Sequence, residues 1–173
     1  MKEQGLSFFK KQVQAVYLSP KEIMKQVGPT FLFLLALAMP AAAQQAAIFP
    51  KGEIATVDNH TGTVWLKELS EPDSVFTYSI ATATFAPGAK LDWHIHPAGQ
   101  ILLITEGTGY YQERGKPRQT VQKGQVIKCL PGVEHWHGAS LKSSFAYVAT
   151  TPTQKGKTIW LKRVTAEEYR TGK

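Results

Sequence analysis

Four of the five histidines in this chain fall into two H-x-H pairs, and this pattern constrains the fold more than any other sequence feature. The pairs are His94 with His96 and His135 with His137. Successive side chains of a β-strand point to opposite faces, so residues two apart share a face. Each pair therefore predicts a strand that presents two imidazoles to one side. Because imidazole is the commonest protein ligand of mid-sized transition metals, the pairs indicate a metal site.

Gln100 follows the first pair after a predicted turn. Residues 97–99 read Pro-Ala-Gly, which favours a turn because proline fixes φ and glycine tolerates positive φ. Gln100 then opens the next strand, so its side chain can return to the site built by His94 and His96. The alternative for all of these side chains is an ordinary half-buried place in a strand.

Nearly all of the chain after residue 43 is typical of short strands rich in Val, Ile, Thr, Tyr and Phe, separated by turn signals. The predicted strands are 62–69, 75–85, 90–96, 100–112, 118–122, 125–130, 134–139, 144–151 and 157–163. Many short strands predict an all-β sandwich or barrel. A short C-terminal helix is expected over 165–169, because Thr165 can cap it and Glu168 completes a capping box.

The first 43 residues have the layout of an N-terminal extension and a secretory signal peptide. An apolar run of 13 residues, 31–43, is short for a membrane span and ends in three alanines that signal peptidases accept, which places cleavage near Ala43. A complete leader begins at Met24, so a start there is a hypothesis, and an N-terminal membrane anchor is the alternative. Residues 44–173 are expected to form one domain, exported to the periplasm without stable membrane insertion after processing.

Composition narrows the possible partners and bonds. The formal net charge is +7, but the basic residues are scattered, so no nucleic-acid partner is expected. Cys129 is the only cysteine, which excludes an internal disulfide and favours a small buried residue. Three tryptophans, Trp93, Trp136 and Trp160, are expected to pack on the outer face of the barrel or in a dimer interface. His60 is expected in a turn, without a role.

Two further side chains have open roles. Asp92 shares the parity of His94, so it either orients an imidazole or stands at the surface where a strand begins. Tyr147 shares a strand face with Phe145 and Ala149. It either reaches the cavity as a proton donor or packs in the core.

The pattern Gly88-x5-His94-x-His96-x3-Gln100-x6-Gly107 resembles the first cupin motif. A glutamate usually stands where this chain has Gln100. The neutral amide leaves a bound divalent ion with more of its positive charge, which makes it a better Lewis acid. Such a centre suits anionic ligands, among them cyanide and alkoxides.

The pattern Gly124-x7-Gly132-x2-His135 resembles the second cupin motif. The usual proline is replaced by Leu130, and an asparagine usual four residues after the histidine is replaced by Ala139. The glycines and the histidine stay in register. The resemblance implies a cupin barrel, a double-stranded β-helix or jelly roll, for residues 44–173.

A narrower resemblance comes from W-H-x-H-P-x-G-Q, P-G-x-x-H-W-H-G-A and V-T-x-E-x-Y, at 93–100, 131–139 and 164–169. These segments are similar to a subgroup of single-domain bacterial cupins that includes manganese-dependent (R)-hydroxynitrile lyases and carboxymuconolactone decarboxylase-like cupins. The resemblance implies a homodimer or higher homo-oligomer, and a divalent metal, with manganese first and Fe, Co, Ni and Zn open. It implies the metal ligands His94, His96, Gln100 and His135, with His137 beside the metal as a supporting or acid/base group.

Three functions on a small-molecule substrate follow as hypotheses. The first is a lyase that cleaves an aromatic cyanohydrin to an aldehyde and HCN, with His137 moving the proton and Tyr147 as a second candidate catalytic group. The second is an iron-dependent dioxygenase acting on a small aromatic or thiol, because open positions on a histidine-rich site also bind oxygen. The third is a non-catalytic periplasmic protein that binds a metal and a small ligand.

Overall fold

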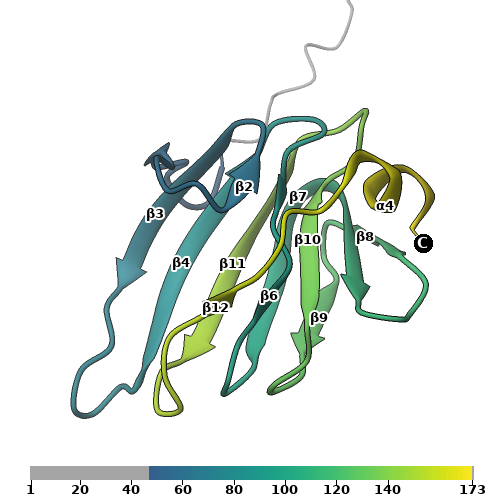
Figure 1. The fold of residues 1–173 in the computed structure, drawn as a ribbon. Helices are drawn as coiled ribbons and strands as arrows, with labels where there is room; N and C mark the ends of the chain where they lie inside the picture. The colour runs from purple at the N-terminus through teal and green to yellow at the C-terminus, as the bar shows by residue number, and fades with distance from the viewer. Residues whose placement is uncertain (1–46, 173) are drawn as a thin grey trace, which may run out of the picture. The chain divides into compact units, whose positions relative to one another are not determined.

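The structure is a computed structural model that describes residues 47–172. The signal peptide predicted over residues 1–43, its cleavage near Ala43 and the start at Met24 all lie outside the described residues. Within residues 47–172 the prediction of an all-β fold with one short C-terminal helix is confirmed (Figure 1). No helix in this described part is long and apolar enough to cross a membrane.

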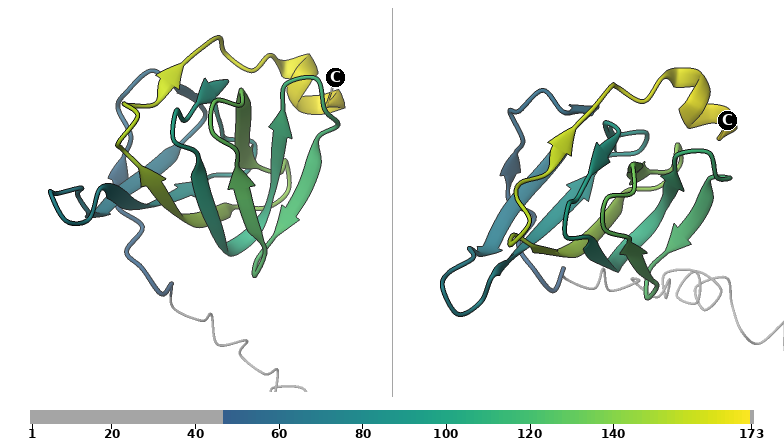
Figure 2. Two further views of the ribbon diagram at one scale, coloured as in Figure 1. Left: turned by 90° about the horizontal axis from the view of Figure 1, so that it is seen from below. Right: turned by 60° about the horizontal axis from the view of Figure 1, so that its bottom comes forward.

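The strands are antiparallel and form a sheet that curls on itself (Figure 2). They are β1 Glu53–Ile54, β2 His60–Thr61, β3 Val64–Ser70, β4 Tyr78–Phe85, β5 Lys90–Leu91, β6 His94–Ile95, β7 Gln100–Glu113, β8 Gln119–Gln122, β9 Val126–Cys129, β10 His135–Ala139, β11 Phe145–Pro152 and β12 Ile159–Trp160. Every predicted strand is present, although 90–96 divides into β5 and β6 and 157–163 shortens to β12. The sequence reasoning did not anticipate β1 or β2.

β7 is the strand that joins the two halves of the curled sheet. Its first part pairs with β9 and β11, and its second part pairs with β8 and β10. The change of partner falls at Gly107, which has φ of 71° and whose added Cβ would lie 1.8 Å from the carbonyl oxygen of Ser144. Only glycine tolerates both the positive φ and this close approach. β7 can therefore pass from one half to the other without ending.

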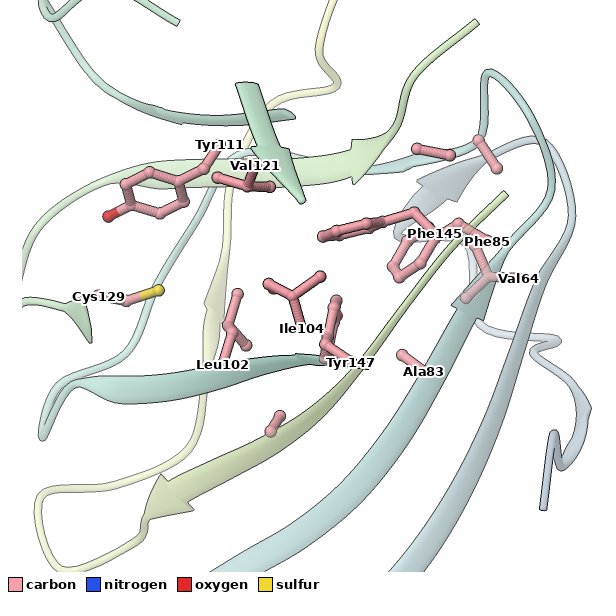
Figure 3. Close-up of a cluster of buried hydrophobic side chains, with 13 residues drawn as sticks. Val64, Ala83, Phe85, Leu102, Ile104, Tyr111, Val121, Cys129, Phe145 and Tyr147 are labelled. Atoms are coloured by element: carbon pink, nitrogen blue, oxygen red, sulfur yellow. The ribbon is translucent and has the colours of Figure 1, made fainter. Parts of the chain in front are cut away.

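The hydrophobic core lies inside the curled sheet (Figure 3). Phe85, Phe145 and Tyr147 pack ring against ring, with centroids 5.6 to 6.1 Å apart. Cys129 belongs to the same cluster, so the prediction that it is a small buried residue is confirmed. Burying a large apolar side chain contributes about 1.5–3 kcal/mol, so this cluster stabilises the pairing of β4 with β11, and Phe85 also packs edge-on against His137 on β10.

A second cluster covers the outer face of the histidine strands. Trp93 and Trp136 point away from the histidines, as the strand parity predicts, and both are buried. Their cover is Val164 and Tyr169 from the C-terminal segment, because the short helix α4, Ala166–Thr171, packs over them. The prediction of an outer-face position therefore holds for these two tryptophans, although the C-terminal segment shields them from solvent.

The predicted helix cap is confirmed. The Thr165 hydroxyl accepts a hydrogen bond from the Glu168 backbone at 3.1 Å, and the Glu168 carboxylate accepts one from the Thr165 backbone at 2.8 Å. The buried Tyr169 hydroxyl then donates to the Ala139 carbonyl oxygen at 2.6 Å. The helix is thus fixed to β10, the strand that carries the second histidine pair.

Candidate metal centre

Neighbouring strands bring the two histidine pairs together. β6 lies antiparallel to β10, and His94 stands directly opposite His135 in the register. The two ring centroids are 4.4 Å apart, and those of His96 and His137 lie 5.0 and 5.1 Å from His94. One ring nitrogen from each of His94, His135 and His137 lies within 4.8 Å of the others. Four imidazoles from two sequence motifs therefore meet at one place.

Backbone carbonyls hold two of these rings. Nδ1 of His94 lies 2.7 Å from the Asp92 carbonyl oxygen, and Nδ1 of His135 lies 2.9 Å from the Val133 carbonyl oxygen. A carbonyl only accepts, so Nδ1 carries the proton and Nε2 presents a lone pair. Asp92 thus orients an imidazole through its backbone, while its carboxylate lies 3.5 Å from Arg163.

The other two rings differ in how they are held. Nδ1 of His96 lies 3.1 Å from the Thr158 hydroxyl oxygen, whereas neither nitrogen of His137 has a hydrogen-bond partner within residues 47–172. The Nε2 atoms of His94, His96 and His135 are also buried without a partner in the described chain. Buried polar atoms without partners are costly and rare. A divalent cation would satisfy these lone pairs, so the donor set fits a metal.

Burial keeps the four imidazoles neutral at neutral pH. Desolvation lowers the pKa of each ring, and repulsion between the rings adds to the effect for His94, His96 and His137. The pKa of His96 falls to about 4, and that of His135 is also lowered. Only neutral imidazole binds a metal, so these rings need not lose a proton first.

Gln100 and Tyr147 lie at the same cavity. The Gln100 amide donates to the Thr151 hydroxyl at 2.9 Å, which fixes its side chain at the start of β7. Tyr147 packs edge-on against His137, with centroids 5.1 Å apart, and also belongs to the core. Tyr147 therefore packs in the core and also lines the cavity, while its role as a proton donor stays a prediction. Burial raises the pKa of Tyr147, so its hydroxyl stays protonated.

The cavity beside the imidazoles has a volume of about 200 Å³. Small apolar side chains from or near β1, β3, β4 and β11 form much of its lining: Ala55, Val64, Ala81, Ala83 and Ala149. The larger apolar side chains of Leu66, Leu91 and Trp160 and several polar side chains also line it: Asn59, His60, Ser79, Thr151 and Thr158. The site is thus a mainly apolar pocket with a few polar groups, the composition of small-molecule sites.

Two expectations about the cavity were wrong. Trp160 was expected on the outer face or in a dimer interface, and the outer face is wrong: Trp160 stands opposite His94 in the β12–β6 register, with the two ring centroids 4.9 Å apart. The dimer interface stays a prediction. His60 was expected in a turn without a role, but it stands in β2 and lines the cavity. β2 and β12 are only two residues long, so their pairing partners, more than any local pattern, place these side chains.

Comparisons with known proteins identify the family and the fold. The family model described as Cupin domain matches residues 81–148. The (R)-mandelonitrile lyase of Granulicella tundricola is 37% identical over 114 residues, which cover 65% of this chain and 87% of the relative. A crystal structure of a cupin-like protein from Thermotoga maritima is 42% identical with a TM-score of 0.69, covering 71% of this chain and 94% of that chain.

A more distant structure shares the fold alone. The polyketide cyclase of Streptomyces resistomycificus has a TM-score of 0.53 at 12% identity, covering 69% of this chain and 85% of that one. The all-β class, the histidine cluster and the matched residues together define a cupin. The chain belongs to the cupin family, as its two motifs indicate.

Proposed function

We propose that this cupin is a metal-dependent lyase that cleaves a small aromatic cyanohydrin to an aldehyde and HCN. The observation that carries the proposal is the group of four buried, neutral imidazoles beside a small apolar cavity. The relative that is named a mandelonitrile lyase supports this reaction type. Because one barrel hosts many chemistries, the reaction rests on the site more than on the fold.

The proposed ligands are His94, His96, Gln100 and His135, with manganese as the metal. The closest grouping of ring nitrogens contains His137 in place of His96, so the two sets compete. We favour the first set because each of its three imidazoles has Nδ1 held by a neighbouring oxygen, whereas His137 has neither nitrogen held. Fixed rings with a bare nitrogen are typical of metal ligands. A bound divalent ion would supply Lewis acidity for an anionic oxygen or cyanide.

His137 is proposed to move the proton. Its neutral imidazole takes the hydroxyl proton of the cyanohydrin while the bond between the carbinol carbon and the nitrile carbon breaks. The electron pair of that bond leaves with cyanide, and the oxygen becomes the aldehyde carbonyl. His137 then returns the proton to cyanide, which leaves as HCN. Tyr147, which stays protonated, donates a hydrogen bond to the substrate oxygen.

The cavity limits the size of the substrate. An apolar cavity of about 150 Å³ is large enough for benzene. The volume of about 200 Å³ found here therefore admits one aromatic ring with a small substituent. The small alanine side chains along the cavity leave room for the aromatic ring of the substrate. The imidazoles would then face the carbon that bears the hydroxyl and nitrile groups.

The test is metal analysis followed by an assay on racemic mandelonitrile. The full-length protein, reloaded with Mn²⁺, should hold about one ion per chain and release benzaldehyde above the background rate. A His94→Ala, His135→Ala double variant should do neither. No cleavage by the Mn-loaded protein would refute the lyase. Oxygen uptake with Fe²⁺ would support the dioxygenase, and a thermal shift without turnover would support the binding protein.

Export and assembly remain part of the proposal. We propose that the leader over residues 1–43 directs the chain to the periplasm and that the folded protein forms a homodimer or higher homo-oligomer. Cell fractionation with N-terminal sequencing tests export, because a processed protein should begin near Gln44. Light scattering of the purified protein tests assembly, and a mass of one chain would contradict it.

A further inference from the structure

The segment that leads into β12 reaches the histidine cluster from outside the two cupin motifs. It lies beyond residues 81–148, which the family model matches. Its strand pairs with β6 so that Trp160 stands opposite His94. Thr158 precedes that strand and lines the cavity, with its hydroxyl oxygen 3.1 Å from Nδ1 of His96.

The hydrogen bond to Thr158 distinguishes His96 from His94 and His135, the other two imidazoles that are held at Nδ1. His94 and His135 each bond to a carbonyl two residues earlier, and a carbonyl can only accept. His96 instead bonds to a hydroxyl 62 residues later in the chain, and a hydroxyl can donate or accept. The direction of this one hydrogen bond therefore decides which nitrogen of His96 carries the proton.

The surroundings of His96 favour one direction. Its Nε2 is buried and makes no hydrogen bond of ordinary geometry in the described chain, although the Gln100 side chain lies near enough to the ring to stabilise its charged form. A buried N–H without an acceptor is rarer and more costly than a bare lone pair. The proton therefore sits on Nδ1 and is donated to Thr158. We propose that Thr158 is a positioning residue that holds His96 with a bare Nε2 directed at the metal site.

Backbone hydrogen bonds on both sides of Thr158 fix the position of this segment relative to His96. Before it, the Thr153 backbone N–H donates to the Thr77 carbonyl oxygen at 2.9 Å. After it, the Leu161 backbone N–H donates to the Trp93 carbonyl oxygen at 2.8 Å. The C-terminal segment thus acts as a second support of the donor set, in addition to the local carbonyls. The part of this inference that concerns metal binding rests on the proposed function, whereas the orientation of His96 by Thr158 does not.

The test compares two substitutions of the full-length protein. Thr158→Val removes the hydroxyl and keeps the shape, whereas Thr158→Ser keeps the hydroxyl. Long-range ¹H–¹⁵N spectra of the metal-free protein show which His96 nitrogen is protonated, with signals assigned by their loss in His96→Gln. Calorimetric titration with Mn²⁺ measures affinity, and circular dichroism with thermal unfolding verifies that each variant is folded.

We expect an Nδ1 proton on His96 in the wild type and in Thr158→Ser, and loss of that preference in Thr158→Val. Mn²⁺ should bind Thr158→Val about 10- to 100-fold more weakly, with Thr158→Ser close to the wild type. A wild-type proton on Nε2, or equal Mn²⁺ affinity in folded Thr158→Val, would overturn the inference. If the wild type binds no Mn²⁺, the proposed function fails instead, and the His96 proton still decides whether Thr158 orients the ring.

Discussion

His94 and His135 face each other across two neighbouring antiparallel strands, with ring centroids 4.4 Å apart. Each ring is held in the same way, by the carbonyl of the residue two places earlier. The two motifs therefore build one half-site each by the same local device. Pairing of β6 with β10 then joins the halves, so the register of these strands sets the distance between the donors.

The proposed division of roles predicts that His96 and His137 respond differently to substitution. His96→Ala should lose most bound Mn²⁺, because it removes a ligand. His137→Ala should keep about one Mn²⁺ per chain and lose cyanohydrin cleavage by about 100-fold or more, because it removes the proton carrier. Metal analysis and the mandelonitrile assay on the same samples measure both effects. His60→Ala is the matched control and should keep its metal. Loss of Mn²⁺ from His137→Ala, with retention in His96→Ala, would assign the metal to the other histidine set.

Acid should destabilise the metal-free protein below pH 6.5. The pKa of all four clustered histidines is lower in the folded state than the usual 6.5, and that of His96 is about 4. Below pH 6.5 the histidines of the unfolded chain bind protons that those of the folded chain do not. The free energy of unfolding is therefore highest above pH 6.5 and falls as the pH is lowered toward 4. Each imidazole contributes a slope of up to about 1.4 kcal/mol per pH unit. Urea unfolding from pH 7.5 to 5 measures this slope, and His96→Gln should make it shallower. A free energy of unfolding that does not change over this range would contradict the prediction.

Trp160 should report metal binding by its fluorescence. Its indole lies 4.9 Å from the His94 ring, whereas Trp93 and Trp136 pack behind the strands under α4. Co²⁺ quenches a nearby indole through its d electrons, so titration should quench part of the wild-type emission. Trp160→Phe should lose most of the metal-dependent change in fluorescence. Trp65→Phe is the control and should keep that change, because the Trp65 ring packs against the Lys51 ammonium group. Equal quenching in Trp160→Phe would place the metal elsewhere.

Alanine at Gly107 should prevent stable folding. Gly107 has φ of 71°, and an added Cβ would lie 1.8 Å from the Ser144 carbonyl oxygen. Gly115 has φ of 77° but no atom within 4 Å of such a Cβ. Gly115→Ala should therefore cost only about 1–2 kcal/mol, the strain of the left-handed conformation, and Gly107→Ala several times more. Urea unfolding and the yield of soluble protein are compared for the two variants. Similar stabilities would show that β7 does not need the close approach of Gly107 to Ser144.

Local patterns predicted most of the fold and the centre of the site. Strand parity placed His94 and His96 on one face and Trp93 on the other, and the Thr165 capping box located the helix. These features depend on neighbours within a few residues, which the sequence displays directly. Trp160 was misplaced because its position depends on how a two-residue strand pairs with β6. The same dependence hid Thr158, whose contact with His96 spans 62 residues.

The continuity of β7 has a consequence for how the protein folds. A single strand of 14 residues pairs with β8, β9, β10 and β11, so neither half of the sheet is finished until this strand has found all four partners. Contacts between residues far apart in sequence slow folding, because the loops between them must close first. The imidazoles of His94 and His135 are 41 residues apart in the chain, so their meeting is itself one of these long-range contacts. A metal bound by the proposed donor set would therefore be expected to slow the unfolding of the barrel more than it speeds its folding.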